Sequence, residues 1–114
     1  MQENDSIRLK HILDAANEAL NFSRGKEVDD LNKDHMLALA LVRLLEIIGE
    51  ATRGLSDDFR DANPEIPWRK MVGMRDRLIH GYFDIDVEVV WKTIVNDLPG
   101  LVSGLERIFS SHEE

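Results

Sequence analysis

The sequence predicts an all-α fold, an up-and-down helical bundle of about five helices joined by short loops. Apolar residues recur at the three- and four-residue spacing of helices along most of the chain, and no alternating run is long enough for a convincing strand. The 114 residues match the size of one ordinary domain, and no linker, repeat or low-complexity segment divides them. We therefore expect a single helical domain over residues 1–114.

The first helix is expected to start after Asp5 or Ser6, because either side chain can cap a helix, and to stop at Gly25. Its predicted buried stripe consists of Leu9, Ile12, Ala16, Ala19 and Leu20. The polar residues 26–33 predict a loop or the irregular start of the next helix.

The second helix, about residues 33–53, is the most apolar, so we expect the rest of the domain or a second subunit to surround it. Gly49 weakens a helix, which makes sense if another helix packs closely there. One charged stripe crosses this apolar background: Arg43, Glu46, Glu50 and Arg53. The stripe is either a solvated face with ion pairs inside the helix or a polar strip in a cleft between two subunits.

A short capped helix is expected to end near Ala62, followed by an extended connector up to Pro67, since residues before proline avoid the helical region. Asp86 is the expected cap of a helix over residues 87–96. The segment 97–100, which contains a proline and a glycine, is expected to break or kink the chain before a last helix from 101 to about 110.

The stretch 67–81 is predicted to be one basic helix with His80 in its last turn and Gly81 just past its end. The negative end of the helix dipole raises the pKa of a histidine there, whereas neighbouring arginines, here Arg75 and Arg77, lower it. A histidine under opposed influences suits proton transfer near neutral pH, and Arg75 offers a planar cation for a phosphate. Because His80 lies well around the helix from Arg75, a shared site needs an unwound helix end or a second copy of the helix. The alternative is a surface helix whose histidine only caps its own end.

The composition excludes several kinds of site. The chain has no cysteine, which excludes disulfides, thiolate metal sites and a cysteine nucleophile. The four histidines are scattered and no glycine-rich phosphate loop is present, so we expect no metal, no cofactor and no P-loop nucleotide chemistry. The polar start of the chain and the lack of a long apolar run predict a soluble cytoplasmic protein that does not enter the membrane.

The formal net charge of −8 argues against a general nucleic-acid coat. Even so, four basic residues gather in one short stretch: Arg69, Lys70, Arg75 and Arg77. A local positive patch on an acidic body suits a compact ligand that contains phosphate, and the acidic faces suit a basic protein partner.

The motif Arg75-x-x-x-x-His80-x-Tyr82 resembles the signature of the HepT-like group of HEPN-domain proteins. Further segments that match the group follow in order over most of the chain: Gly49-Glu50-Ala51, Leu55-Ser56, Ile66-Pro67-Trp68-Arg69, Gly73-Met74, Leu78-Ile79, Gly81, Phe83, Trp91 and Asp97-Leu98-Pro99. Asp76 departs from the pattern, because the group is expected to have a neutral amide there. An acid beside Arg75 weakens the attraction for phosphate slightly.

The resemblance implies a helical bundle that forms a homodimer, with a cleft where the two Arg–His motifs meet. It implies a metal-independent endoribonuclease that is the toxin of a toxin–antitoxin pair, with Arg75 and His80 as catalytic residues. The implied partner is a small nucleotidyltransferase antitoxin that transfers AMP to Tyr82, in an assembly that can be larger than a dimer. The residues expected to line the cleft are Arg43, Glu46, Glu50, Arg69 and Arg77.

Elementary chemistry agrees with this expectation. RNA breaks without a metal when its own 2′-OH attacks the adjacent phosphorus, which requires a proton shuttle and a cation on the developing charge. His80 suits the first role and Arg75 the second, and two copies could supply acid and base separately. AMP on Tyr82 would place bulk and negative charge where the RNA phosphate sits.

Two other interpretations of the sequence remain open. The chain could be a non-catalytic helical module that binds a nucleotide, RNA or the antitoxin through the same basic patch, which the net charge of −8 and Asp76 favour. It could also be a purely structural dimer.

Overall fold

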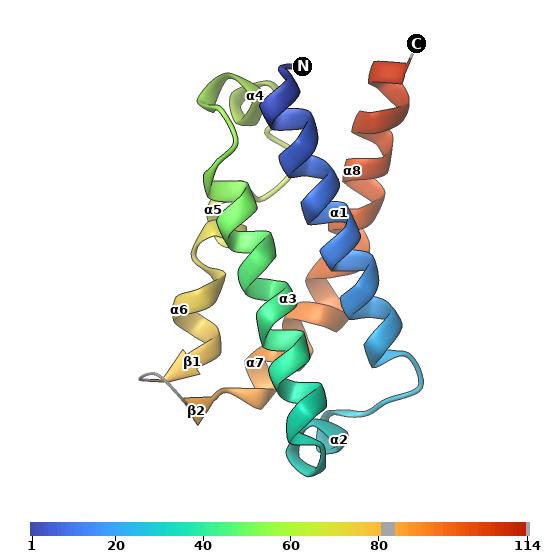
Figure 1. The fold of residues 1–114 in the computed structure, drawn as a ribbon, viewed down its shortest axis with the longest axis vertical. Helices are drawn as coiled ribbons and strands as arrows, with labels where there is room; N and C mark the ends of the chain where they lie inside the picture. Colours follow the sequence, from blue (N-terminus) through green and yellow to red (C-terminus); the bar gives the residue numbers. More distant parts are fainter. Residues whose placement is uncertain (81–83, 114) are drawn as a thin grey trace.

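The computed structural model describes residues 1–80 and 84–113, without the side chains of Arg75, Ile79, His80 and Glu113. Two long antiparallel helices, α1 (Glu3–Ser23) and α3 (His35–Arg53), pack side by side and form one half of an elongated bundle of 45 × 29 × 20 Å (Figure 1). The other half consists of α5 (Trp68–Val72) and α6 (Met74–Leu78), then α7 (Val87–Lys92), the π-helical segment η1 (Thr93–Asp97) and α8 (Leu98–Glu113). The predicted all-α, up-and-down bundle is therefore confirmed.

The ends of the bundle are closed by short elements. Helix α2 (Val28–Lys33) lies beside the start of α3 at one end of the bundle, and α4 (Asp57–Ala62) lies at the opposite end (Figure 1). Strands β1 (Ile79–His80) and β2 (Asp84–Ile85) pair antiparallel, with Ile79 opposite Ile85 and His80 opposite Asp84. These two-residue strands were not expected from the sequence, because they are too short to show alternation.

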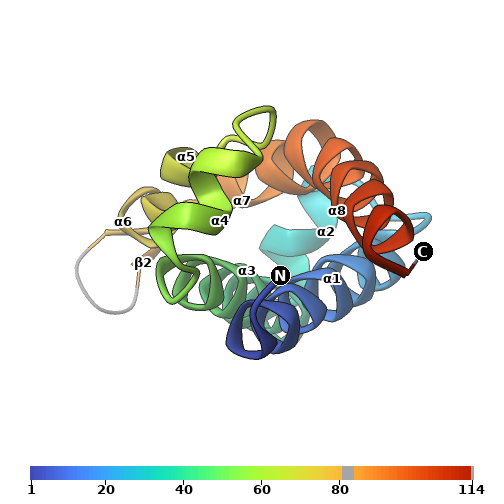
Figure 2. The same ribbon diagram turned by 90° about the horizontal axis from the view of Figure 1, so that it is seen from above.

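The core lies inside a ring of helices (Figure 2). The predicted stripe of α1 is confirmed for Leu9, Ile12, Ala16 and Ala19, which are fully buried, whereas Leu20 is half-buried against the core. Helix α3 is less completely surrounded than expected: Met36 is 81% exposed and Leu39 48% exposed. The domain alone thus leaves an apolar surface at the start of α3.

The expected cap of α1 is wrong, because the helix already begins at Glu3 and Asp5 lies inside it. The Asp5 side chain is buried, and its two oxygens accept hydrogen bonds from the backbone N–H and the hydroxyl of Ser56, at 2.8 and 2.7 Å. Ser56 in turn caps α4 by accepting from the N–H of Phe59. Asp5, a residue type that often caps helices, here links α1 to the residue that caps α4.

Two other expectations need correction. Residues 28–33 form a helix and not a loop, because Glu27 and Asp30 make a reciprocal capping box that stabilises this short polar turn. The chain also remains helical through residues 97–100. A wider π-turn just before Pro99, in which the N–H of Leu98 bonds to the carbonyl of Thr93, accommodates the proline without a break.

The expected cap of α7 is confirmed, since the Asp86 carboxylate accepts from the N–H of Val89 at 3.2 Å. Among the described helices, none is long and apolar enough to cross a membrane.

Candidate functional site

Helix α5 is held at its first residue by the indole of Trp68. This side chain is buried, its Nε1–H donates to the carbonyl of Asn63 at 2.9 Å, and its ring lies 5.9 Å from that of Phe59. The close approach expected at Gly49 is confirmed, because a Cβ atom there would lie 3.1 Å from the carbonyl oxygen of Met71 in α5. These contacts fix α5 against α3, and α5 leads directly into α6.

The single helix expected over residues 67–81 is wrong in two respects. The helix is interrupted at Gly73, and the last turn is replaced by the strand pair β1–β2. The N–H of Asp86 donates to the carbonyl of Leu78 at 2.7 Å, so the returning strand takes an acceptor that a longer helix would have used. His80 therefore lies in a strand, beyond a helix of only five residues, and the argument from a helix dipole does not apply to it.

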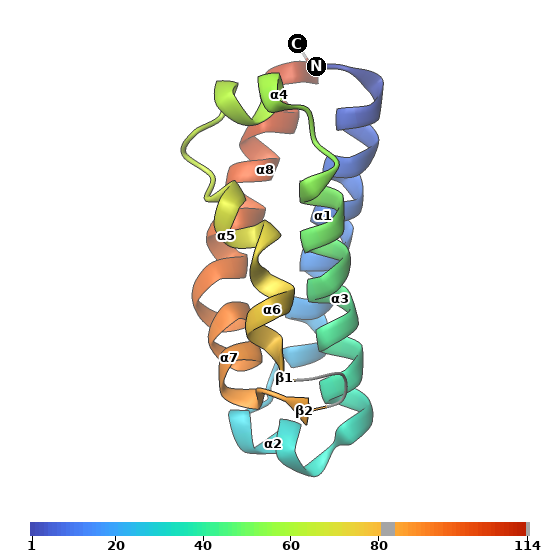
Figure 3. The same cartoon turned by 90° about the vertical axis from the view of Figure 1, so that its left-hand side faces the viewer.

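The register of α6 separates its two arginines. Met74 and Leu78 are both buried and face the core, while Asp76 and Arg77 are exposed. Positions 75 and 77 lie about 160° apart around a helix, on opposite flanks of this core-facing line. Helix α6 packs between α3 and α7 (Figure 3).

The contacts of Arg77 show which flank of α6 faces α7 and which faces α3. It donates from Nη2 to the carbonyl of Lys70 at 3.0 Å, and it lines a hollow that α7 and η1 form on their side. Position 75 is therefore on the flank towards α3. Within one chain, positions 75 and 77 therefore lie on different flanks of α6.

His80 follows α6 directly, in strand β1. The backbone of His80 pairs with that of Asp84, which places a carboxylate residue directly opposite the predicted proton shuttle. Tyr82, the predicted site of modification, lies outside the described residues. The roles of Arg75, His80 and Tyr82 stay predictions.

The other residues expected to line the cleft lie on three helices. Arg43, Glu46 and Glu50 are on α3, Arg69 is on α5 and Arg77 is on α6. Arg43, Glu50 and Arg69 are exposed, and Glu46 is half-buried. Arg43 and Glu50 form no ion pair with any described residue, so the stripe on α3 presents charge outward. A cleft between two subunits remains a prediction.

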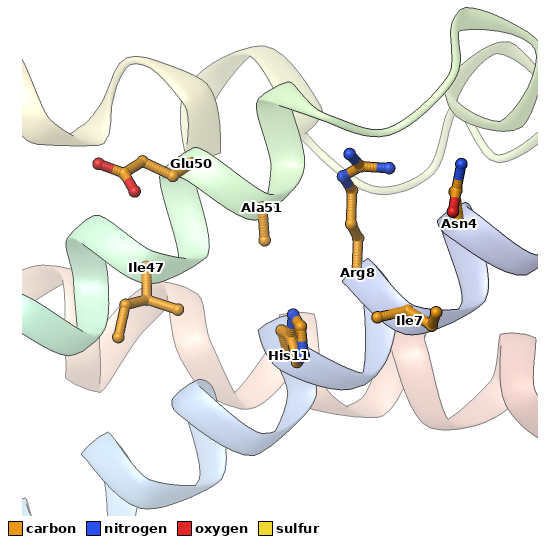
Figure 4. Close-up of a pocket in the computed structure, with 7 residues that line it drawn as sticks. All are labelled: Asn4, Ile7, Arg8, His11, Ile47, Glu50 and Ala51. Atoms are coloured by element: carbon orange, nitrogen blue, oxygen red, sulfur yellow. The ribbon is translucent and has the colours of Figure 1, made fainter.

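Glu50 also borders a hollow of about 380 Å³ between α1 and α3 (Figure 4). Arg8 and His11 of α1 line it together with Ile7 and Ile47. In Figure 4 the Glu50 carboxylate extends away from Arg8 and His11, so the hollow does not gather these groups around one point. The His11 side chain is exposed.

Sequence reasoning missed Lys92 as a neighbour of the basic stretch. Lys92 of α7 lines the same hollow as Lys70 and Arg77, although it follows Arg77 by fifteen residues. The basic stretch itself was visible in the sequence, but only the packing of α7 against α6 brings a third cation to it. In the described part of the chain, no three His, Asp or Glu side chains gather as a metal site would require.

Comparison with known proteins points to a nuclease family. The family described as ribonuclease HepT-like matches residues 12–108. The chain is 41% identical over 108 residues to "Probable ribonuclease HepT" of Thermococcus cleftensis, which covers 95% of this chain and 98% of the relative. Proteins of Methanocaldococcus jannaschii and Caldanaerobacter subterraneus, whose names also call them RNases, are 40% and 37% identical, over 88% and 92% of this chain and 92% and 94% of their own lengths. No solved structure matches the chain with significance.

Proposed function

Because the chain belongs to the ribonuclease HepT-like family, we propose that it is a metal-independent endoribonuclease with Arg75 and His80 as its catalytic residues. The family match over residues 12–108 carries the proposal, since it includes both residues and the helices that pack against α6, namely α3, α5 and α7. The fold supports it, because α6 and β1 place the two residues at one end of the bundle.

The proposed reaction is an internal transfer in the RNA. His80 takes the proton of a 2′-OH, and the freed oxygen attacks the adjacent phosphorus to form a 2′,3′-cyclic phosphate. The bond to the 5′-oxygen breaks, and that oxygen leaves as a hydroxyl after it receives a proton. Arg75 stabilises the negative charge that develops on the phosphoryl oxygens.

We further propose that the active form is a homodimer. His80 lies in β1, the strand that follows α6. A second copy of the chain would provide a second His80, so that one histidine acts as the base and the other as the acid on opposite sides of one phosphate. The apolar surface that Met36 and Leu39 leave exposed on α3, beside outward charges such as Arg43, is consistent with a second copy packing there.

The finer part of the proposal concerns control. The chain would be the toxin of a toxin–antitoxin pair, neutralised when a nucleotidyltransferase antitoxin transfers AMP to Tyr82. Tyr82 lies two residues after His80 in the sequence, so a nucleotide attached to it would bring a phosphate and a base close to the catalytic histidine.

The chemistry of the products tests the proposal. Purified protein in excess chelator should cut single-stranded RNA and leave 2′,3′-cyclic phosphate and 5′-hydroxyl ends, while the same sequence with 2′-deoxyribose stays intact. Arg75→Ala, purified in parallel, should lose about 10²-fold or more in rate and so control for contaminating nucleases. Products with 3′-hydroxyl and 5′-phosphate ends, or activity that chelator abolishes, would contradict the mechanism.

A further inference from the structure

A basic hollow lies on the flank of α6 opposite position 75. Its volume is about 400 Å³, and α5, α6, α7 and η1 form its walls. The described residues that line it are Lys70, Arg77, Val89, Lys92, Thr93, Asn96 and Asp97. The hollow therefore sits beside the helix that carries the predicted catalytic arginine.

The charge in this hollow is opposite to that of the whole molecule. Lys70, Arg77 and Lys92 contribute three positive charges and Asp97 one negative charge. The chain as a whole has a formal net charge of −8. Another described hollow, between α1 and α8, contains Lys10 with Asp14 and Glu106 and is acidic. An excess of positive charge is thus a local property of the α6–α7 face.

The three cations differ in how firmly they are held. Lys70 is bound to Asp97 at 3.0 Å, and Arg77 donates to the carbonyl of Lys70 at 3.0 Å, so both are fixed at the wall of the hollow. Lys92 forms no ion pair with any described residue and is exposed. Glu88, one turn earlier on α7, is exposed but does not line the hollow.

The polar wall suits a phosphodiester. Arg77 retains donors that its single hydrogen bond to Lys70 does not use, and Asn96 offers an amide from the π-helical segment. A π-turn is a wider coil that is frequent at functional sites, and here it positions Asn96 and Asp97 on the hollow.

We infer that this hollow, formed by Lys70, Arg77 and Lys92, binds the phosphate backbone of the RNA away from the cleavage point. The inference rests on the proposed function, because it takes RNA as the substrate. A strand that passes over α6 from the flank of Arg75 to the flank of Arg77 would place one phosphate at the reaction and another on Lys92. Such a contact depends on the charge of the phosphates and not on the bases, so it would add affinity for long RNA of any sequence.

Lys92 gives the cleanest test, because neither a described ion pair nor the core depends on it. The probe is a single-stranded DNA oligonucleotide of about 16 nucleotides, which the proposed mechanism cannot cut because it lacks the 2′-OH. Lys92→Gln should weaken its binding about three- to tenfold, and should reduce the slope of log K against log salt by about 0.7. Lys92→Glu should weaken binding further, and Lys92→Arg should bind like the parent.

Lys10→Gln is the matched control, since it removes an exposed lysine from the acidic hollow on another face. Equal affinity and equal salt slope for the parent, Lys92→Gln and Lys92→Glu would overturn the inference. So would the same loss in Lys10→Gln, because the effect would then come from net charge alone.

Cleavage kinetics separate this inference from the proposed function. With long RNA, Lys92→Gln should raise KM and leave kcat unchanged, whereas a substrate of two nucleotides should be cut equally well by both proteins. Cleavage with no effect of Lys92 would reject only the phosphate site. Binding that depends on Lys92, without any cleavage by the parent, would reject only the ribonuclease activity.

Discussion

At the scale of single residues, Asp5 and Trp68 fix the two ends of the segment between α3 and α5. Asp5 links α1 to Ser56 through two hydrogen bonds, and Trp68 links α5 to Asn63 and Phe59. Hydrogen bonds to a charged, buried acceptor contribute about 1.5–3 kcal/mol each. The chain between α3 and α5 is therefore fixed by specific polar contacts at both ends.

The residue-scale prediction concerns Tyr82, which is the one tyrosine of the sequence. We expect the parent protein, incubated with a nucleotidyltransferase antitoxin and ATP, to gain the mass of one or more AMP units and to lose cleavage. Tyr82→Phe should gain no mass and should continue to cut RNA, because it lacks the phenol oxygen that accepts the nucleotide.

The control for this measurement omits ATP, which should leave both proteins unmodified and active. A mass increase on Tyr82→Phe would show that a serine or threonine is modified instead. Loss of activity by the parent without any mass increase would show that the antitoxin acts only by binding.

At the scale of elements, the position of α6 depends on the approach of α5 to α3. Gly49 has no Cβ atom, which allows α5 to lie close to α3. A Cβ atom at position 49 would lie 3.1 Å from the carbonyl oxygen of Met71. Gly73 then separates α5 from α6, and the pairing of β1 with β2 ends α6 at Leu78. The position of the segment with the proposed catalytic residues thus depends on backbone packing more than on its own helix propensity.

Gly49→Val should therefore displace α5 and, with it, α6. We expect a loss of about 1–3 kcal/mol in the free energy of unfolding, measured by denaturant titration, from overpacking against the Met71 backbone. RNA cleavage should fall even at temperatures where the variant is fully folded, because α6 follows α5 after one residue.

Gly100→Ala is the matched control, because its Cβ would meet nothing within 4 Å in α8. It should gain about 0.5–1 kcal/mol from the lower backbone entropy of alanine in the unfolded chain and keep full activity. A Gly49→Val protein with the stability and activity of the parent would contradict the proposed close approach.

The elements that depend on periodicity could be predicted from the sequence, whereas the contacts between distant residues could not. The stripe of α1 and the cap at Asp86 follow from spacing and residue type, and both are observed. The partner of Asp5 is 51 residues away along the chain, so no local pattern could show it. The strand pair at His80 joins neighbouring residues, but its two-residue strands are too short to show alternation. For the site, the motif residues were visible in sequence, whereas the third cation, Lys92, became apparent only through the packing of α7 on α6.

At the scale of the whole molecule, an acidic chain carries one hollow with an excess of positive charge, formed by α5, α6, α7 and η1. The net charge of −8 disfavours indiscriminate binding to nucleic acid, because phosphates are repelled from most of the surface. A concentrated positive face would then direct RNA to one end of the bundle. A second copy that covers the apolar start of α3 would leave the hollow at Lys92 open, since that hollow lies on the opposite flank of α6.

The role of His80 as the proton shuttle of a metal-independent ribonuclease can be measured by RNA cleavage in excess chelator, with the parent and His80→Ala assayed side by side. Circular dichroism should show that both proteins are equally helical, and intact mass should show that Tyr82 is unmodified. We expect the parent to cut RNA and His80→Ala to lose at least about 10²-fold in rate, because no other group replaces the proton shuttle. Cleavage by His80→Ala at the rate of the parent would remove His80 from the mechanism, and binding without cleavage by the parent would make the protein an RNA-binding module.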